Sequence, residues 1–582
     1  MRRAVLAACV LLAAAAPASA QVDFSGNWAA LFHEDQPERV PGPEIGDYLA
    51  LPITDEARAH AEAWSPSLLT LPEHQCKPHP VAYGYRGPAN MRVQQEIDPL
   101  TQRIVKITIH IQWQEQFREI WMDGRPHPPA AAAHTWQGFS TGRWDGNALV
   151  VTTTHMKPGW VRRNGVWYSD QARFTDRFVR HGDVLTHMAV LEDPLTLTEP
   201  FVRTTNWALA PTQTIEPYPC IIVDEIATHK LGDVPHFLPG TNNMLNDFAR
   251  SFNLDPRWAQ GGTYTHFPEF RTLSRTPAPA PPIARPARPG ELAILPVQGN
   301  VHLLTGAGSN IVLQTGPDGV LVIDSGPEAM AERVLAAIRE FAAGKPIRYV
   351  INTSADAAHT GANEVIGRAG STIAGGDIRN ALGDTSGDGA AIVAHEAVQQ
   401  RMAASAGGAN PVPFGRWPTE TFFTEKKELF FNGEGVQVLH VPKAHTDGDL
   451  MIYFRKSDVL VVGDLFSTEG YPVIRTDQGG AINGVIAALN RMIDISIPKE
   501  KQEGGTYIVG GHGRIVDEAE VVDYRDMITI VRDRVQDLIT KGRTLEQVRA
   551  ANPTFEYDKR WSGGEGSAET APFVEAVYRT LR

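Results

Sequence analysis

The chain has 582 residues and a formal net charge of −13 at pH 7, because 67 Asp and Glu outnumber 54 Lys and Arg. No basic block offsets this charge, so nucleic acid and anionic membranes are not expected as partners. A chain of this length exceeds what one hydrophobic core usually serves, which predicts at least two domains.

The N-terminus has the pattern of a cleavable export signal. Arg2 and Arg3 precede an apolar run, and the small residues Pro17 to Ala20 follow it. The pattern predicts a signal peptide over residues 1–20 and a mature chain that is periplasmic or secreted. The apolar run is too short for a comfortable membrane span, and Cys9 lies too early in it for a lipoprotein site. No stable membrane anchor is therefore expected.

Two cysteines would remain after the signal is removed, Cys76 and Cys220. An exported chain reaches a compartment where disulfides persist. Two interpretations stay open, a single bridge between the two residues or two separate buried thiols. Neither cysteine belongs to a Cys-x-x-Cys pair, so cysteine chemistry is not expected in catalysis.

A change of composition marks a domain boundary. Residues 276–290 read TPAPAPPIARPARPG and consist almost wholly of Pro, Ala and Arg. Such a segment cannot bury a core and favours an extended, semi-rigid spacer. The sequence therefore predicts one domain over residues 21–275 and a second over residues 291–582.

The first half predicts a mainly antiparallel β domain of unknown function. Strand-like segments lie at 104–113, 117–122 and 148–154, with turn signals such as Asp123-Gly124 between them. A barrel or a sandwich is the economical way to bury such hairpins. The phrases REIWMDGRPHP and GRWDGNALVVTTTH resemble an uncharacterised β-rich domain of secreted bacterial proteins, and that resemblance implies no activity.

The histidines and tryptophans of this half do not point to a site. The histidines lack the spacing of zinc ligands, and the tryptophans are typical of core and rim positions. These residues include His127, His134, His155, His181 and His187, and Trp28, Trp113, Trp121, Trp136 and Trp144. A groove for a sugar or a peptide stays open, as does a protein partner bound through this domain.

The second half alternates buried strands with amphipathic helices. Residues 311–313 and 319–325 are predicted strands around a Gly-Pro-Asp-Gly turn. Residues 328–342 have helical periodicity, and residues 348–352 form a further predicted strand that ends at a polar loop. The order of these elements, with a histidine in the loop, resembles the opening of the metallo-β-lactamase superfamily.

This resemblance implies an α+β protein of two domains whose C-terminal half is an αββα sandwich. In the superfamily, the phrase VLVIDSG corresponds to a strand whose aspartate, here Asp324, organises the site from behind. A simple turn or cap residue is the alternative interpretation of Asp324.

The family's main ligand motif is incomplete in this chain. The superfamily loop reads Thr-His-x-His-x-Asp-His, which supplies ligands to two metal positions. Here residues 353–359 read TSADAAH. Ser354 and Asp356 therefore stand where histidines are expected and Ala358 where an aspartate is expected, so that only His359 is kept. Three of the four usual ligands of this loop have changed.

The remaining motifs are present in order. His445 follows the predicted strand 436–441, Asp464 ends the apolar run that begins at Val459, and His512 follows Tyr507-Ile508-Val509. Each polar residue comes at the carboxyl end of a strand, where α/β folds place their sites. The resemblance implies that His445 and His512 are the later histidine ligands and that Asp464 is a bridging carboxylate.

The surviving residues imply a reduced, single-metal site. His359, Asp464 and His512 would hold the second metal position, which is enough ligands for a catalytic zinc. The first position would keep His445, with Asp356 as an oxygen ligand and Asp464 as a bridge. One ion is expected rather than two, with zinc as the expected metal and iron as an alternative.

Such a site predicts a metal-dependent hydrolase that attacks an ester, lactone, thioester or amide through a metal-activated water. Asp464 is a predicted catalytic residue, and Asp356 is the predicted general base in place of the family aspartate. The alternative from a different class is a non-catalytic descendant of the fold that binds a ligand or a partner. Ser354 has two interpretations, a hydrogen-bond donor or a filler of the vacated histidine space.

The segment 466–484 corresponds to a region that lines the substrate pocket in the family. It contains Tyr471 and Arg475, which are predicted to bind a small-molecule substrate. Arg475 suits a substrate carboxylate, and an ordinary surface arginine is the alternative. The tail 518–582 is predicted to be mainly helical, with Thr544 capping a helix, and to carry no chemistry.

Overall fold

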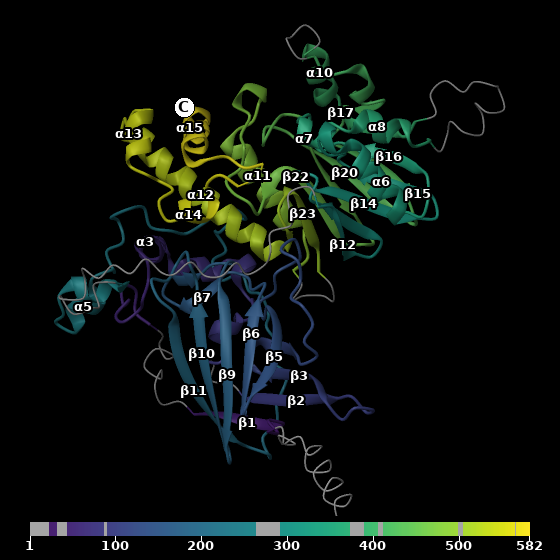
Figure 1. Cartoon of the computed structure of the whole chain (residues 1–582). Helices are drawn as coiled ribbons and strands as arrows, with labels where there is room; N and C mark the ends of the chain where they lie inside the picture. The colour runs from purple at the N-terminus through teal and green to yellow at the C-terminus, as the bar shows by residue number, and fades with distance from the viewer. Residues whose placement is uncertain are drawn as a thin grey trace, which may run out of the picture.

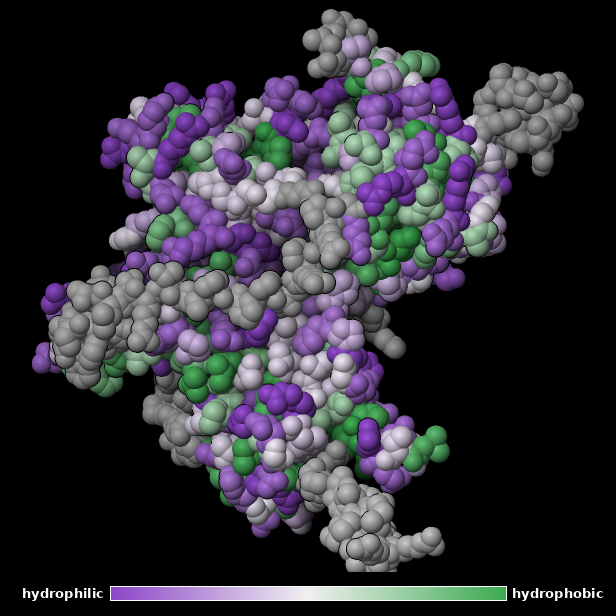
Figure 2. All heavy atoms as spheres, viewed as in Figure 1, coloured by the Kyte–Doolittle hydropathy of each residue, from purple (hydrophilic) through white to green (hydrophobic). Residues whose placement is uncertain are grey.

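The computed structural model divides into two domains (Figure 1). It describes residues 22–31, 43–86, 90–262, 291–372, 389–405, 411–498, 505–564 and 566–582. The predicted signal peptide, residues 1–20, and the predicted linker, residues 276–290, lie outside the described residues. No described helix is both long and apolar enough to cross a membrane. Polar side chains cover much of the face in Figure 2, and apolar surface there is broken into separate patches.

The N-terminal domain is a closed, mainly antiparallel barrel in the strand order β1-β11-β10-β9-β6-β5-β4-β3-β2. Its strands are β1 (Gly26–Leu31), β2 (Met91–Ile97), β3 (Ile104–Ile111), β4 (Gln116–Trp121), β5 (Phe139–Asp145), β6 (Ala148–Thr154), β9 (Arg173–His181), β10 (Val184–Glu192) and β11 (Phe201–Leu209). Trp28 and Trp207 are fully buried in its core. Closure leaves these strands without open edges, which is one way a β domain avoids edge-to-edge association.

The barrel histidines take part in local polar contacts. His187 lies in the interior beside the Asp176 carboxylate, which also pairs with the buried guanidinium of Arg118. His127 bonds two threonine hydroxyls, and the Nδ1 of His134 lies 3.0 Å from the carbonyl oxygen of Met156. Because a buried polar group must be paired, these contacts account for the three histidines as structural residues.

Smaller elements cap the barrel. They comprise the ribbon of β7 (Gly159–Arg162) and β8 (Val166–Tyr168), the helices α3 (Asp55–Ala63), α4 (Val81–Gly84) and α5 (Asp247–Ser251), and the 3-10 turns η1 (Pro66–Thr70) and η2 (Pro72–His74). Of the two interpretations of the cysteines, the structure has the bridge. Cys76 and Cys220 form a disulfide across 144 residues of sequence, which ties the segment after β11 to the cap.

The C-terminal domain contains two sheets. The first has the order β12 (Ala293–Gln298), β13 (Val301–Thr305), β14 (Ile311–Gly316), β15 (Gly319–Ile323), β16 (Ile347–Ile351), β17 (Ala391–His395) and β18 (Glu420–Phe422). The second has the order β19 (Lys426–Phe431), β20 (Glu434–Val441), β21 (Asp449–Phe454), β22 (Val459–Ser467), β23 (Tyr507–His512) and β24 (Ile515–Asp517). Strand pairs β15–β16 and β22–β23 are parallel, so their carboxyl ends lie at the same edges.

Helices cover the outer face of each sheet. They are α6 (Ala331–Phe341), α7 (Ala357–Thr360), α8 (Asn363–Arg368) and α10 (Glu396–Ala404) in the first half of the domain, and α11 (Ile482–Ile495), α12 (Glu518–Thr540), α13 (Leu545–Ala550), α14 (Asp558–Trp561) and α15 (Thr570–Leu581) in the second. The predicted capping of α13 by Thr544 is confirmed, because its side chain accepts from the backbone N–H of Gln547.

Strand β15 shows why the layers form. Its side chains alternate between two hydrophobic clusters: Leu321 and Ile323 face the second sheet, whereas Val320 and Val322 pack against α6. Successive side chains of a strand point to opposite faces, and a strand that is apolar on both faces must be covered on both. The predicted αββα sandwich is thus confirmed.

Ion pairs join the two domains along α12, which lies between the barrel and the rest of the C-terminal domain in Figure 1. The carboxylate of Asp170 bonds two guanidinium groups, that of Arg514 at 3.1 Å and that of Arg560 at 2.7 Å. The buried ammonium of Lys157 pairs with Asp517, the residue that caps α12. Burial opposes ionisation of Asp170, but the two arginines outweigh it and hold its pKa well below the usual range.

We expect Asp170→Asn to lower the free energy of unfolding at pH 7 by about 3–5 kcal/mol, because it removes the carboxylate paired with the part-buried Arg560 and one of the two carboxylates paired with the buried Arg514. A folded pKa below the unfolded value contributes stability that is lost as the pH falls. The deficit should therefore be constant at neutral pH and shrink below about pH 4, where unfolded aspartate protonates. Urea denaturation at several pH values measures both effects.

Asp145→Asn is the matched control. Asp145 pairs with Arg177 on the barrel surface, where both side chains are about half exposed. An exposed pair contributes about 0–1 kcal/mol, so this variant should unfold almost as the parent does. Equal effects of the two substitutions would show that Asp170 does not hold the domains together.

Candidate metal centre

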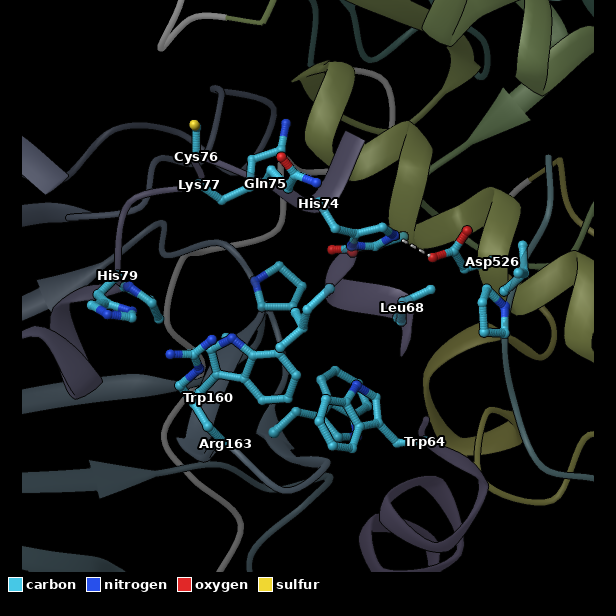
Figure 3. Close-up of a pocket in the computed structure, with 18 of the residues that line it drawn as sticks. Trp64, Leu68, His74, Gln75, Cys76, Lys77, His79, Trp160, Arg163 and Asp526 are labelled. Atoms are coloured by element: carbon cyan, nitrogen blue, oxygen red, sulfur yellow. Dashed lines mark hydrogen bonds and ion pairs between the residues drawn. The ribbon is translucent and has the colours of Figure 1, made fainter. Parts of the chain in front are cut away.

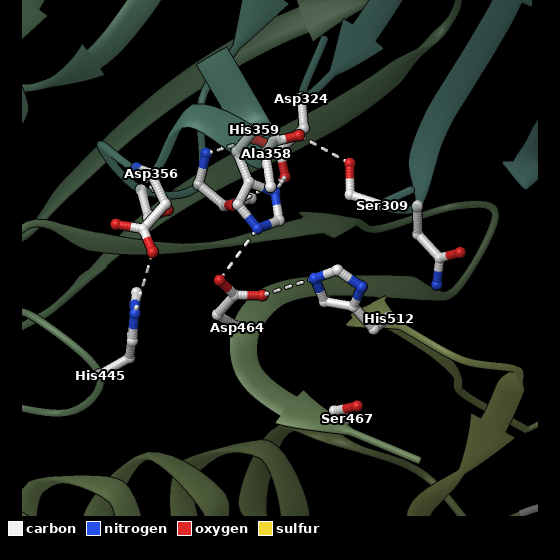
Figure 4. A network of polar contacts seen from close by, with 12 residues as sticks. Ser309, Asp324, Asp356, Ala358, His359, His445, Asp464, Ser467 and His512 are labelled. Carbon is white, nitrogen blue, oxygen red and sulfur yellow. Dashed lines mark hydrogen bonds and ion pairs between the residues drawn. The ribbon is translucent and has the colours of Figure 1, made fainter. Parts of the chain in front are cut away.

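The four predicted ligands meet at one edge of the sandwich (Figure 4). His359 lies in α7 after β16, His445 follows β20, Asp464 lies in β22, and His512 ends β23. These positions are far apart in sequence, but the strands that carry them end close together. The structure brings His359, His445, Asp464 and His512 together.

A glycine conformation sets the position of Asp464. Gly463 has a φ of +51°, and a Cβ at this position would lie 2.4 Å from Oγ1 of Thr353. Only glycine adopts this backbone freely and allows so close an approach. The pairing between β22 and β23 shifts register at the same point. Strand β22 therefore continues through Asp464 to Ser467 and does not end with the apolar residues that begin at Val459. This bulge turns the Asp464 side chain toward the histidines.

Asp464 is shared by two groups of candidate ligands. In the first group, Nε2 of His359 lies 3.0 Å from Oδ2 of Asp464, and Nε2 of His512 lies 3.7 Å from Oδ1. In the second group, Asp464 stands with His445 and Asp356. Within each group the ligand atoms lie within 4.8 Å of one another. The two groups correspond to the second and first metal positions that the sequence implied.

The first position has an arginine beside it. Oδ2 of Asp356 lies 3.7 Å from Nε2 of His445 and accepts a hydrogen bond of 2.7 Å from Arg475. The guanidinium thus supplies a positive charge next to the carboxylate that would serve as a ligand. The three candidate ligands of the second position are the more buried set.

Each of two histidines is oriented by a second carboxylate. Nδ1 of His359 lies 2.8 Å from Asp324, and Nδ1 of His445 lies 3.1 Å from Asp449. A carboxylate only accepts hydrogen bonds, so each Nδ1 carries the hydrogen and each Nε2 is free to face the site. Asp324 has a φ of +60° and also accepts from the backbone N–H and hydroxyl of Thr353. The interpretation of Asp324 as an organising residue is confirmed, and Asp449 is a counterpart that the sequence analysis missed.

The carboxylates give the centre a strong preference for positive charge. Burial opposes protonation of His359, but Asp464 and Asp324 raise its pKa well above the usual value. Burial likewise opposes protonation of His445, and its bonds with Asp356 and Asp449 raise its pKa to about 10. Burial raises the pKa of Asp464, yet His359 and the other histidines lower it far more. A cation bound here would replace protons that these groups otherwise hold.

The donor set fits a metal ion. Nε2 of His445 and Oδ1 of Asp464 are buried without a hydrogen-bond partner among the described residues, and Nε2 of His359 faces Oδ2 of Asp464 at 3.0 Å. Buried polar atoms are nearly always paired, so two unpaired atoms in one place call for a ligand. Imidazole nitrogens with carboxylate oxygen are typical of zinc and of non-haem iron.

The altered loop residues have distinct places. Ser354 is buried, and its Oγ accepts a hydrogen bond from the backbone N–H of Asp356 at 3.3 Å. This hydrogen bond stabilises the turn. The carbonyl of Ala358 accepts a hydrogen bond from the hydroxyl of Ser309, so this residue contributes only its backbone to these contacts.

The two predicted substrate contacts have different outcomes. The prediction for Tyr471 is wrong: the side chain is fully buried, stacks on Phe573 at 4.6 Å and donates its hydroxyl hydrogen to Asp558. It is a core residue that anchors the tail. Arg475 lies at the first metal position with 44% of its side chain exposed, so it can reach a bound molecule.

The C-terminal tail comes closer to the centre than the sequence suggested. A Cβ on Gly566 would lie 2.1 Å from Nε2 of His512, and Gly566 has a φ of +66°. Its backbone therefore packs against the imidazole ring, an approach that any side chain would block. The isolated bridge between Tyr471 and Ala568 holds this segment in place. The tail thus packs on the fold beside His512, and the expectation that it carries no chemistry stays a prediction.

Comparison with known proteins agrees with the geometry. Residues 304–512, within the C-terminal domain, match the family model described as the metallo-beta-lactamase superfamily. No curated protein matches the chain.

Several solved structures are similar to parts of the chain. They include the sec-alkylsulfatase Pisa1 from Pseudomonas sp., with 15% identity, a TM-score of 0.37 and coverage of 50% of each chain. The chain therefore spans half the length of that protein. A metallo-beta-lactamase from Pontibacter korlensis has 15% identity and a TM-score of 0.31, covering 41% of this chain and 99% of its own. The B3 metallo-beta-lactamase BLEG-1 has 18% identity and a TM-score of 0.29, covering 41% and 100%.

We expect the purified protein to hold about one equivalent of metal, because Arg475 competes at the first position. His359→Ala and His512→Ala should abolish the metal content, whereas Ser354→Ala and His445→Ala should keep most of it. Elemental analysis and the loss of thermal stability on adding a chelator measure this. A content of two metal equivalents per protein, half of which is lost in His445→Ala, would contradict the assignment of a single ion. Full metal content in both His359→Ala and His512→Ala would show that these residues are not the ligands.

The supporting carboxylates give a second test. Asp324→Asn should weaken metal binding by about 10–100-fold, because loss of such a partner frees the orientation of the ligand imidazole. Asp449→Asn is the matched control, since it makes the same change behind His445 at the first position. Competition with a chromophoric chelator measures both affinities. If Asp449→Asn has the larger effect, the ion binds at the first position instead.

Proposed function

We propose that the C-terminal domain is a metal-dependent hydrolase that acts on a carbonyl substrate, such as an ester, lactone, thioester or amide, in an exported protein. The observation that carries the proposal is the convergence of His359, His445 and His512 on the Asp464 carboxylate, where Nε2 of His445 and Oδ1 of Asp464 are buried without a hydrogen bond to a described residue. Purely structural residues would have hydrogen-bond partners there. The preference of the same site for positive charge supports a cation as the missing ligand.

The chain's own residues would hold and orient the metal. His359, His512 and Asp464 would be its ligands, and Asp324 would keep the His359 ring in place. A zinc or iron ion in such a site lowers the pKa of its bound water and polarises a carbonyl group. The burial of His359 and His512 excludes bulk water from one side of the centre, which strengthens electrostatic interactions with a substrate.

Asp356 stays the proposed general base. Burial raises its pKa, but its contacts with His445 and Arg475 outweigh this and lower the pKa to about 2. Its carboxylate is therefore ionised at neutral pH, as a base must be, although so low a pKa makes a weak base. The side chain is 17% exposed, and its Oδ2 lies 3.7 Å from Nε2 of the buried His445. This position suits a group that passes a proton between the centre and water.

Arg475 is the proposed recognition group for a substrate carboxylate. Its guanidinium is half exposed beside the centre and uses one nitrogen for its bond to Asp356. The remaining N–H groups can bind a carboxylate in a charge-assisted pair. A substrate with an acidic group near its scissile bond would be positioned in this way.

A screen of ester, lactone, thioester and β-lactam compounds, with an aryl sulfate as the non-carbonyl comparison, tests the proposal. At least one carbonyl compound should be hydrolysed, and the activity should disappear with chelator and in His359→Ala and His512→Ala. Metal-loaded protein that cleaves none of them would support the non-catalytic alternative. Cleavage of the sulfate alone would overturn the carbonyl class while leaving the hydrolase.

Arg475→Ala tests the recognition group. A charge-assisted hydrogen bond contributes about 1.5–3 kcal/mol, so KM for a substrate with a free carboxylate should rise about tenfold or more. KM for the methyl ester of the same acid should hardly change, which makes the neutral compound the internal control. An equal rise for both substrates would indicate that Arg475 acts on the centre and does not bind the carboxylate.

A further inference from the structure

A cavity of about 470 Å³ lies between the two domains, apart from the metal centre (Figure 3). Its walls come from the barrel cap, including η1, η2 and the disulfide, and from α12 and Trp561 of the C-terminal domain. The volume lies within the range typical of small-molecule sites, which often occur at domain interfaces. None of the residues already assigned to the metal centre lines it.

The walls are unusually rich in tryptophan. Five of these residues line the cavity, namely Trp64, Trp136, Trp160, Trp167 and Trp561. The rings of Trp64 and Trp160 meet edge to face, with centroids 5.5 Å apart. Indole rings offer flat apolar surface to another aromatic ring and negative faces to a cation. The cavity is thus suited to an aromatic body, a cationic group or both.

Some charged groups that line the cavity are already paired, whereas Arg163, Glu225 and Asp523 form no ion pair with a described residue. His74 pairs with Asp526 at 2.8 Å, and Lys77 pairs with Glu518. The exception on α12 is Asp523, which lies three residues before Asp526 and so shares its face of the helix. Asp523 lines the cavity and forms no hydrogen bond or ion pair with any described residue.

The surroundings of Asp523 leave its charge uncompensated. The Asp523 side chain is exposed toward the cavity. Desolvation by the crowding of neighbouring groups raises its pKa to about 7, and the nearby Asp526 and Glu520 add to this, whereas His74 and Lys157 partly oppose it. The His74 imidazole is already engaged by Asp526 and Lys157 by Asp517. A cation from outside the protein would therefore gain more at Asp523 than at either paired carboxylate.

The charged groups at the two ends of the cavity also determine how a bound ligand would be oriented. Figure 3 shows Arg163 and His79 at one end of the cavity, and His74 and Asp526 at the other, with Trp160 and Trp64 between them. Arg163 is exposed and places a positive charge at its end of the cavity, away from Asp526 on α12. A ligand with one positive group would therefore place that group at the α12 end and its body among the tryptophans.

We propose that this interdomain cavity binds an aromatic amine, with its ring among the tryptophans and its ammonium group on the carboxylate of Asp523. This binding site is independent of the metal centre and of the hydrolase proposal. The ligand class is defined by two features, a flat apolar body and a single cationic nitrogen.

Three indole compounds that differ only in charge test the proposal: tryptamine, the neutral alcohol tryptophol and the anion indole-3-acetate. Calorimetry on the full-length, chelator-treated protein at pH 8 removes any contribution from bound metal. Tryptamine should bind at least tenfold more tightly than the other two. Equal or tighter binding of indole-3-acetate would overturn the proposal, as would no binding of tryptamine.

Variants test which residues bind the ammonium group and which bind the indole ring. Asp523→Asn should weaken the binding of tryptamine at least tenfold and change the affinity for tryptophol less than twofold. Unchanged binding of tryptophol also shows that the cavity is intact. Trp160→Ala should weaken both compounds. Asp537→Asn, on the same helix but paired with Lys541 outside the cavity, is the matched control and should change neither. Unchanged tryptamine affinity in Asp523→Asn would show that the amine does not bind this carboxylate.

Discussion

The carboxylate of Asp464 lies between His359 and His512 and is also shared with the group around His445. Because it is buried, its negative charge must be balanced, and the histidines and any bound cation are the groups that balance it. The positions of the surrounding strands follow from this requirement. Gly463 bends β22 so that the carboxylate points inward, and Asp324 turns His359 to meet it.

The N-terminal domain forms ion pairs with the segment that follows His512. Arg514 follows His512 by two residues and pairs with Asp170 of the barrel domain, and Asp517 pairs with Lys157. The segment that carries a proposed ligand is thus held by ion pairs across the domain interface. The two halves therefore form one structural unit around α12, and the interdomain cavity is a consequence of how they meet.

The sequence predicted the main ligands for a local reason. His359, His445, Asp464 and His512 each follow an apolar strand, and such positions can be found without knowing how the strands pack. Asp356 was predicted in the same way and lies with His445. Tyr471 was placed wrongly because a tyrosine among glycines near a site has the same local pattern whether its ring faces a substrate or the core. Only its packing on Phe573 distinguishes the two.

The sequence by itself determined the two-domain division, the β-rich and αββα classes and the loss of family ligands from the loop 353–359, because these depend on composition, periodicity and short motifs. The tertiary structure alone decided that Cys76 pairs with Cys220, that Asp449 supports His445 and that Gly566 packs on His512. It also decided that Arg475 pairs with Asp356 beside His445. These are contacts between distant segments, and their energies depend on distances and burial that no local pattern records.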